Sequence, residues 1–312
     1  MKNRTDLFSA RLKIKSVLFF LAGLLIAGWW SPACAGAGTL SIQQIAPGVY
    51  AAIGDQGNAN AGFILTKEGV VVVDSQINPR AAQAMLKAVR KVTAKPILYL
   101  INTHAHGDHT FANHVIEPAR GIIAHARTKA ILASRGQEMV KEYSRFVGVE
   151  AAKGAQVTLP NITLTEEMTL PIADRTIVVR YLGIGHTVGD VIVWLPTEKV
   201  IFTGDLVYIN RLPWLGEGES REWLKGLARL RALPFERVVP GHGPVGDRKS
   251  VERFERYLST LRRIVVEAFL RKIPLEQLKQ TVKIPAYEKD LKYKEWLPLN
   301  VEQVYRQMEK ER

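Results

Sequence analysis

Thr103-His104-Ala105-His106-Gly107-Asp108-His109 is the stretch that decides the fold of this chain, and it directly follows the apolar run of residues 97–101. A buried strand that ends in three imidazoles and a carboxylate is costly to build for packing alone. Neutral imidazole and carboxylate are ligands that zinc prefers. Alternate residues of an extended chain point to one side, so His104 and His106 can face one metal ion. The adjacent Asp108-His109 pair can reach a second ion.

Regular elements surround this loop. Residues 70–73 are four consecutive valines that end at Asp74, which is typical of a strand buried on both faces. Residues 79–93 carry apolar side chains at helical spacing, and Pro79 suits the first turn of a helix. The order strand, helix, strand, loop places the histidines at the carboxyl end of a strand, where open α/β sheets hold their sites.

The rest of the chain repeats strands followed by helices. We expect further strands at residues 48–53, 61–66, 122–126, 162–164, 176–182, 191–195 and 200–203. We expect further helices at residues 127–134, 138–146, 221–233 and 250–272, and another from residue 301. Two such halves predict two sheets packed face to face with helices outside, which is a four-layer α/β/β/α sandwich.

The first 35 residues have the order of a secretory signal. Basic residues precede an apolar run at 17–30, and Ala33-Cys34-Ala35 provides small residues for cleavage. We therefore predict a signal peptide at 1–35, a periplasmic or secreted protein, and no stable membrane insertion after cleavage. An uncleaved anchor helix and a lipid anchor at Cys34 are the less favoured alternatives. Because Cys34 is the only cysteine, the mature chain would have no disulfide and no thiolate ligand.

The formal net charge of +13 does not indicate a nucleic-acid site. The basic residues are interspersed with acidic ones, as in residues 287–292, and form no basic block. We interpret them as a solvated surface and expect a small-molecule substrate.

Three more potential metal ligands follow predicted strands, and each lies next to or one residue from a glycine, which allows tight turns and close backbone approach. They are His186, Asp205 and His242. The remaining histidines, His114 and His125, lie outside these contexts, and we expect them to be surface or packed residues.

Residues 40–250 resemble the metallo-β-lactamase superfamily of hydrolases. The residues that carry the resemblance, in order, are His104-x-His106-x-Asp108-His109, His186, Asp205 and His242. The resemblance implies two zinc ions per chain. One zinc would be held by His104, His106 and His186. The second would be held by Asp108, His109 and His242, with Asp205 bridging the two.

The resemblance also assigns roles outside the ligand set. Asp74 matches an early aspartate that braces the histidine loop, and Asp190 resembles another structural residue of this kind. Residues 251–312 lie beyond the resemblance, and we expect them to form a C-terminal helical extension packed on the same domain.

The resemblance implies a metal-dependent hydrolase in which a metal-bridging hydroxide attacks an ester, lactone, thioester or amide carbonyl. Asp108 would orient the hydroxide and pass a proton to the leaving group. Tyr208 would donate to the developing oxyanion, with a packed loop aromatic as the alternative for this residue.

Two alternative functions stay open. A true metallo-β-lactamase fits export, because β-lactams act in the periplasm. However, Asp205 stands where one lactamase subclass has a metal-binding cysteine, and lactamases generally lack a bridging aspartate. The aspartates and residues 45–50, Ile-Ala-Pro-Gly-Val-Tyr, look more like the periplasmic zinc hydrolases associated with quinoproteins. An iron-dependent redox member is less favoured, because diiron reductases of the fold carry glutamate where this chain has His106.

Overall fold

The structure is a computed structural model that describes residues 40–54 and 58–311. The signal segment expected at residues 1–35 lies outside the described residues. The described residues belong to one compact unit. No helix in this part of the chain is long and apolar enough to cross a membrane.

The first sheet contains seven strands in sequence order. They are β1 (Leu40–Ala46), β2 (Val49–Gly54), β3 (Ala61–Leu65), β4 (Val70–Val73), β5 (Ile97–Ile101), β6 (Gly121–His125) and β7 (Ile162–Leu164). Strands β1 to β4 pair antiparallel, and β4 to β7 pair parallel. The carboxyl ends of β4 and β5 therefore lie at the same edge, next to the histidine loop.

The second sheet contains five strands in the order β12-β11-β10-β9-β8. They are β8 (Glu167–Ile172), β9 (Arg175–Tyr181), β10 (Val191–Leu195), β11 (Val200–Tyr208) and β12 (Arg237–His242). Strands β8 to β11 are antiparallel, whereas β11 and β12 are parallel. The parallel pair carries Asp205 and His242 toward the same end.

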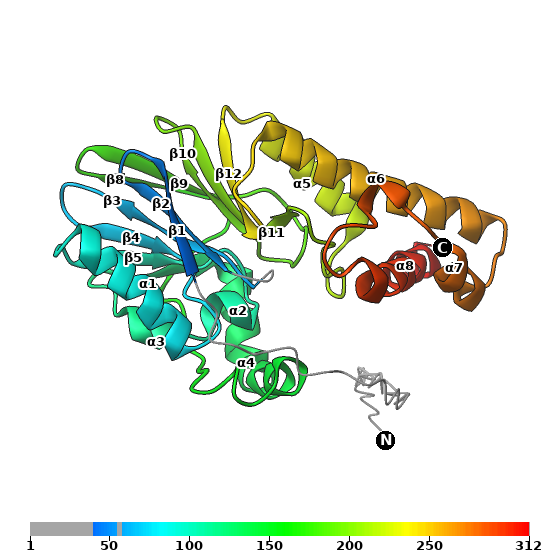
Figure 1. Ribbon diagram of the computed structural model, residues 1–312, viewed down its shortest axis with the longest axis horizontal. Helices are drawn as coiled ribbons and strands as arrows, with labels where there is room; N and C mark the ends of the chain where they lie inside the picture. The colour runs from blue at the N-terminus through cyan, green and yellow to red at the C-terminus, as the bar shows by residue number, and fades with distance from the viewer. Residues whose placement is uncertain (1–39, 55–57, 312) are drawn as a thin grey trace, which may run out of the picture. The chain divides into compact units, whose positions relative to one another are not determined.

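The two sheets pack face to face with helices on their outer sides (Figure 1). The four valines of β4 show this most clearly: Val71 and Val73 belong to the core between the sheets, and Val70 and Val72 pack toward the helix α1 (Pro79–Val92). All four are at most 1% exposed, and each such burial contributes about 1.5–3 kcal/mol. The predicted four-layer α/β/β/α sandwich is confirmed.

Further helices cover the sheets. On the side of the first sheet are α2 (Gly107–Thr110), α3 (Asn113–Ile116) and α4 (Ala126–Val147). The second sheet is covered by α5 (Ser220–Arg231) and α6 (Arg248–Leu270), which lie side by side (Figure 1). The chain then forms α7 (Leu275–Thr281), a short 3-10 helix (Pro285–Tyr287) and α8 (Tyr293–Lys310). Helices α5 to α8 share one apolar cluster with the second sheet.

Several expected boundaries differ from the structure. The two helices expected at 127–134 and 138–146 are one continuous helix, α4. Gly136 lies within this helix and packs closely against Val157. Strand β11 continues to Tyr208, so Asp205 lies inside a strand and not after one. Helix α8 begins at Tyr293 and tolerates Pro298 within its first two turns. The C-terminal extension expected from residue 251 starts within α6, and its bounds stay a prediction.

Candidate metal centre

The seven expected ligands come from separate elements and meet at one edge of the two sheets. His104 and His106 lie in the loop after β5, and Asp108 and His109 lie in the one-turn helix α2. His186 follows β9 in the loop before β10. The remaining two ligands, Asp205 and His242, are on β11 and β12.

These side chains form two groups, each with potential ligand atoms within 4.8 Å of one another. The first group is His104, His106, His186 and Asp205, and the second is Asp108, His109 and His242. The grouping agrees with the ligand sets implied by the resemblance, although the roles of the individual residues stay a prediction.

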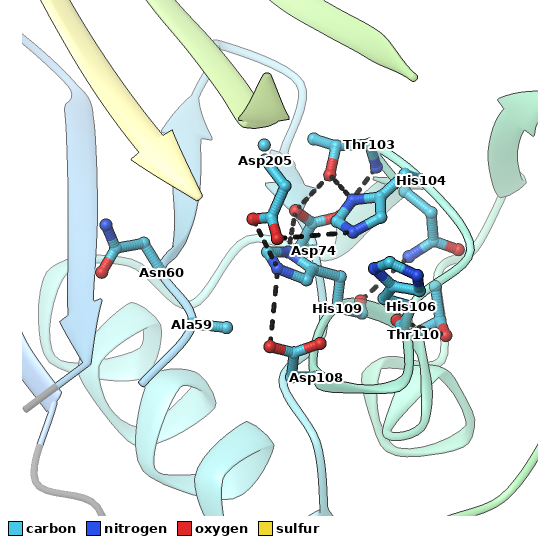
Figure 2. A network of polar contacts seen from close by, with 12 residues as sticks. Ala59, Asn60, Asp74, Thr103, His104, His106, Asp108, His109, Thr110 and Asp205 are labelled. Carbon is cyan, nitrogen blue, oxygen red and sulfur yellow. Dashed lines mark hydrogen bonds and ion pairs between the residues drawn. The ribbon is translucent and has the colours of Figure 1, made fainter. Parts of the chain in front are cut away.

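The carboxylate of Asp205 lies between the two groups. Its Oδ2 is 3.3 Å from His186 Nε2 and 3.4 Å from His242 Nε2. Its Oδ1 is 3.2 Å from His109 Nε2 (Figure 2). The backbone of Gly241 approaches it so closely that a Cβ added there would lie 1.8 Å from Oδ1. Glycine at 241 therefore leaves the space that the shared carboxylate occupies.

The donor set fits metal ions. The atom His104 Nε2 is fully buried and makes no hydrogen bond to any described residue. The buried atoms His109 Nε2 and Asp205 Oδ1 have no hydrogen bond of normal geometry and lie 3.2 Å from each other. Unsatisfied buried polar atoms cost about 1–3 kcal/mol each. Bound cations would offset this cost, because the lone pairs of imidazole and carboxylate are what borderline metals bind.

The pKa values of the buried imidazoles are shifted in two opposite directions. Burial lowers the pKa of His186 to about 3 and the pKa of His104 well below its usual value, so both rings are neutral and able to bind metal. Burial acts the same way on His109, but the carboxylates of Asp205, Asp108 and Asp74 outweigh it and raise its pKa. Asp205 itself stays ionised, because the nearby imidazoles outweigh burial and lower its pKa.

Asp74 braces the histidine loop, as expected. Its Oδ1 accepts a hydrogen bond from Thr103 N, and its Oδ2 accepts from Thr103 Oγ1 and pairs with His109 Nδ1, all at 2.8 Å (Figure 2). The backbone of Asp74 has φ = 60°, a left-handed conformation that costs a non-glycine residue on the order of 1 kcal/mol. The contact to Nδ1 leaves Nε2 of His109 directed at the carboxylates of Asp205 and Asp108.

Asp190 organises the loop that carries His186. Its carboxylate accepts hydrogen bonds from Thr187 N and Thr187 Oγ1, both at 2.7 Å. The next residue, Val191, donates to the Thr103 carbonyl at 2.8 Å. The His186 loop is thereby tied to the histidine loop.

Asp190 also predicts a pH dependence of stability. Burial raises its pKa to about 7, against the two hydrogen bonds from Thr187, whereas the unfolded chain loses this proton near pH ~3.9. Between these two pH values the folded state binds more protons than the unfolded chain. Asp190 therefore makes the free energy of unfolding fall as pH rises.

Asp190→Asn should remove this contribution, because the amide mimics the protonated acid. In denaturant unfolding of the metal-free protein, the stability of wild type relative to the variant should fall by up to about 1.4 kcal/mol per pH unit between about pH 4 and 7. Parallel stability profiles would contradict the prediction.

Two side chains that the sequence did not single out contact the ligands. Tyr143 of α4 donates its hydroxyl to Asp108 Oδ1 at 2.6 Å. Glu217, in the segment between β11 and α5, has its Oε2 3.7 Å from His106 Nε2. The nearby His106 imidazole is the main reason that the pKa of Glu217 is lowered to about 2.

A third residue that was missed, Asn60, holds the two sheets together beside His242. Its Nδ2 donates to the carbonyls of Pro240 at 2.9 Å and Gly243 at 2.8 Å. Figure 2 shows Asn60 and Ala59 on the opposite side of Asp205 from the histidine loop. No pattern in the sequence marks these contacts, because their partners are far apart in the chain. Tyr143 and Asp108 are 35 positions apart, and Asn60 and Pro240 are 180 positions apart.

The remaining predicted residues have definite places. Tyr208 is buried, donates its hydroxyl to Asp205 Oδ2 and stacks its ring on His242 at 5.2 Å. Its catalytic role stays a prediction. His125 caps α4 by accepting from Arg127 N at 3.1 Å, and neither His125 nor His114 belongs to the two ligand groups.

Comparisons with known proteins agree with this geometry. The family model of the Metallo-beta-lactamase superfamily matches residues 54–242. A metallo-beta-lactamase type 2 from Bacillus sp. (strain 170) is 28% identical over 222 residues, covering 68% of this chain and 79% of that protein. A metallo-beta-lactamase type 2 from Bacteroides fragilis is 24% identical over 206 residues, covering 64% of this chain and 75% of that protein.

Solved structures share the fold. A metallo-beta-lactamase from Pontibacter korlensis superimposes with a TM-score of 0.59 and 21% identity over 70% of this chain and 99% of that chain. The inverting sec-alkylsulfatase Pisa1 from Pseudomonas sp. has a TM-score of 0.71 and 16% identity over 86% of this chain and 50% of that chain. The second match covers so much of this chain that it must include part of the region after residue 242. This chain belongs to the metallo-beta-lactamase superfamily and is a metal-dependent hydrolase with a dinuclear His/Asp site.

Proposed function

We propose that the protein opens β-lactam rings by hydrolysis, using two zinc ions held by the two ligand groups. The observation that carries the dinuclear part is the carboxylate of Asp205, which lies within 3.4 Å of imidazole nitrogens from both groups. The relatives named as metallo-beta-lactamases support the β-lactam substrate. They favour a true metallo-β-lactamase, which the sequence left as an alternative, over the first expectation of a general ester, lactone, thioester or amide hydrolase.

The more exposed ligands indicate where a substrate reaches the site. The side chains of Asp108 and His106 are 20% and 12% exposed, whereas the other five are at most 6% exposed. When bound, two zinc ions would lower the pKa of a water and polarise the substrate carbonyl. A carbonyl group would therefore approach past Asp108 and His106.

The contacts of Asp108 support a role in proton transfer. Its Oδ1 accepts the hydrogen bond from Tyr143, and its Oδ2 is 3.4 Å from His242 Nε2. The neighbouring imidazoles outweigh burial and keep the pKa of Asp108 below its usual range. An ionised carboxylate at the exposed side of the site can take a proton from water and give it to the departing amide nitrogen.

Tyr143→Phe tests this placement of Asp108. Loss of the hydroxyl leaves Oδ1 of Asp108 unrestrained, so we expect kcat or zinc affinity to fall roughly 10-fold or more. The phenyl ring keeps its edge contact with Phe111 at 5.6 Å, so the fold should persist. Steady-state kinetics and zinc titration measure the effect, and Tyr305→Phe, which removes a hydroxyl bonded to Ile273 O, is the control. Equal values for both variants would contradict the role.

A broader carbonyl hydrolase is the second candidate, and Asp205 favours it. The resemblance implies that dedicated lactamases generally lack such a shared aspartate. The relationship to quinoprotein-associated zinc hydrolases stays a prediction that rests on this aspartate and on residues 45–50. Export to the periplasm also stays a prediction, and it agrees with a β-lactam substrate.

A substrate panel distinguishes the two candidates. The zinc-loaded protein is assayed with nitrocefin, a lactone, a thioester and an aryl ester, with and without a chelator. We expect nitrocefin turnover that the chelator abolishes and added zinc restores. Chelator-sensitive turnover of the other three substrates without nitrocefin would replace β-lactam opening by the broader activity.

A further inference from the structure

We propose that Glu217 orients the imidazole of His106 for metal binding, and that the C-terminal helix α8 holds Glu217 in place. This inference rests on the proposed dinuclear centre. It adds a positioning residue, Glu217, that is held by a helix from outside the family match, which ends at residue 242.

The two ring nitrogens of His106 have different neighbours. Nδ1 is 2.8 Å from His186 Nε2 and therefore belongs to the ligand cluster. Nε2 is 3.7 Å from Glu217 Oε2, a distance that a small side-chain rotation closes to a hydrogen bond. A histidine that binds metal through one nitrogen is oriented by a carboxylate that accepts the N–H of the other nitrogen. Glu217 is in the position to do this for His106.

Glu217 is held from a second direction by α4. Its Oε1 is 3.4 Å from Arg135 Nη1, so each carboxylate oxygen has its own partner. The side chains of Glu217 and Arg135 are 42% and 46% exposed. An ion pair with this exposure contributes at most about 1 kcal/mol to stability. The pair therefore orients the carboxylate without contributing much to the fold.

The backbone that carries Glu217 needs an external support. Glu217 lies between Gly216 and Gly218, and glycine allows the chain many conformations unless other contacts restrict it. Both glycines are packed closely: a Cβ at 216 would lie 2.6 Å from the Trp214 ring, and one at 218 would lie 3.0 Å from Trp223. The segment is closely packed. Because glycines flank Glu217, the backbone conformation here depends on contacts from other parts of the chain.

Helix α8 supplies the support through two buried amides seven residues apart. Asn300 donates through Nδ2 to Pro213 O at 3.0 Å and accepts from Leu215 N at 3.3 Å. Gln307 donates through Nε2 to Gly218 O at 2.6 Å. It also accepts from the backbone N of Ser220 at 3.2 Å.

These amides are 1% and 3% exposed, and burial of an amide is costly unless its hydrogen bonds are made. The hydrogen bonds to residues 213–220 satisfy both amides. Displacement of the segment would break these bonds, so α8 resists it on both sides of Glu217.

Zinc titration of the full-length protein against a chromophoric chelator tests the role of Glu217. Glu217→Gln should weaken binding of one of the two zinc ions by about 10-fold and leave the other unchanged. Glu142→Gln, which removes another carboxylate near Arg135 at 4.0 Å, should leave both affinities as in wild type. Side-chain ¹⁵N NMR should find the proton of His106 on Nε2 in the zinc-loaded wild type.

Gln307→Met tests the role of α8. It should weaken the same zinc ion, and the double variant with Glu217→Gln should bind no more weakly than Glu217→Gln alone, because both changes act through one contact. Gln303→Met on the same helix is the matched control. If Gln307→Met does not fold, Ser220→Ala replaces it, because this change removes the hydroxyl that donates to Gln307 Oε1 at 2.5 Å.

Wild-type affinities in Glu217→Gln, or additive losses in the double variant, would overturn the inference. A wild-type protein that binds no zinc would instead overturn the proposed function, so the two failures are distinguishable.

Discussion

Asp205→Ala is expected to abolish hydrolysis and to remove both metal ions. The carboxylate lies close to both ligand groups, with Oδ2 toward His186 and His242 and Oδ1 toward His109. Its loss takes a ligand from both groups and leaves buried imidazoles without their counter-charge. Metal activation of water and carbonyl supplies several kcal/mol, so kcat/KM should fall at least about 10³-fold.

The assay combines turnover with metal content of the purified variant. His114→Ala is the control, because His114 lies outside both ligand groups and should keep its activity and its metal. Turnover near the wild-type rate in Asp205→Ala would show that the shared carboxylate is not needed and would remove the basis of the proposed mechanism.

Trp223→Ala should cause the largest loss of stability. Trp223 of α5 is fully buried, and its indole Nε1 donates to Leu206 O at 3.0 Å. Its ring lies 5.5 Å from His186 and 5.7 Å from Phe254 of α6. Removal of the indole leaves a cavity and an unpaired carbonyl, so the free energy of unfolding should fall by about 3–5 kcal/mol.

Denaturant unfolding of the metal-free protein measures this cost directly, without a contribution from bound metal. Leu270→Ala is the control, because Leu270 is 73% exposed and should change stability by less than about 0.5 kcal/mol. A loss below about 1 kcal/mol in Trp223→Ala would mean that the contact between α5, α6 and the His186 loop contributes little to the fold.

The local patterns in the sequence predict the layers of the fold. The valines of β4 are buried on both faces because one strand separates two cores, and an unbroken apolar run is the signature of that position. Asn78 accepts a hydrogen bond from Ala81 N at 2.9 Å at the start of α1, and Pro79 follows in its first turn. Short-range patterns of this kind determine where elements lie.

The residues of the two groups of potential ligands were also predictable, because they lie in one histidine motif or beside glycines after predicted strands. What the sequence could not provide is the set of contacts that orient them. Tyr143 is separated from Asp108 by 35 residues, and Gln307 from Gly218 by 89. These pairings depend on how whole helices pack, and neither residue stands in a motif of its own.

The length of β11 illustrates the same limit. The sequence pattern predicted a strand that ends at Thr203, directly before Gly204. In the structure the parallel pairing with β12 continues through irregular register to Tyr208 and His242. The partner strand therefore decides the end of β11, and this brings Asp205 between the two ligand groups.

The metal content of the purified protein tests the central claim most directly. Elemental analysis of the zinc-supplemented, dialysed full-length chain should give two zinc ions per chain for the wild type, and a large loss of both for Asp205→Ala. One ion or fewer per wild-type chain, or an unchanged content in Asp205→Ala, would contradict a dinuclear centre built around a shared carboxylate.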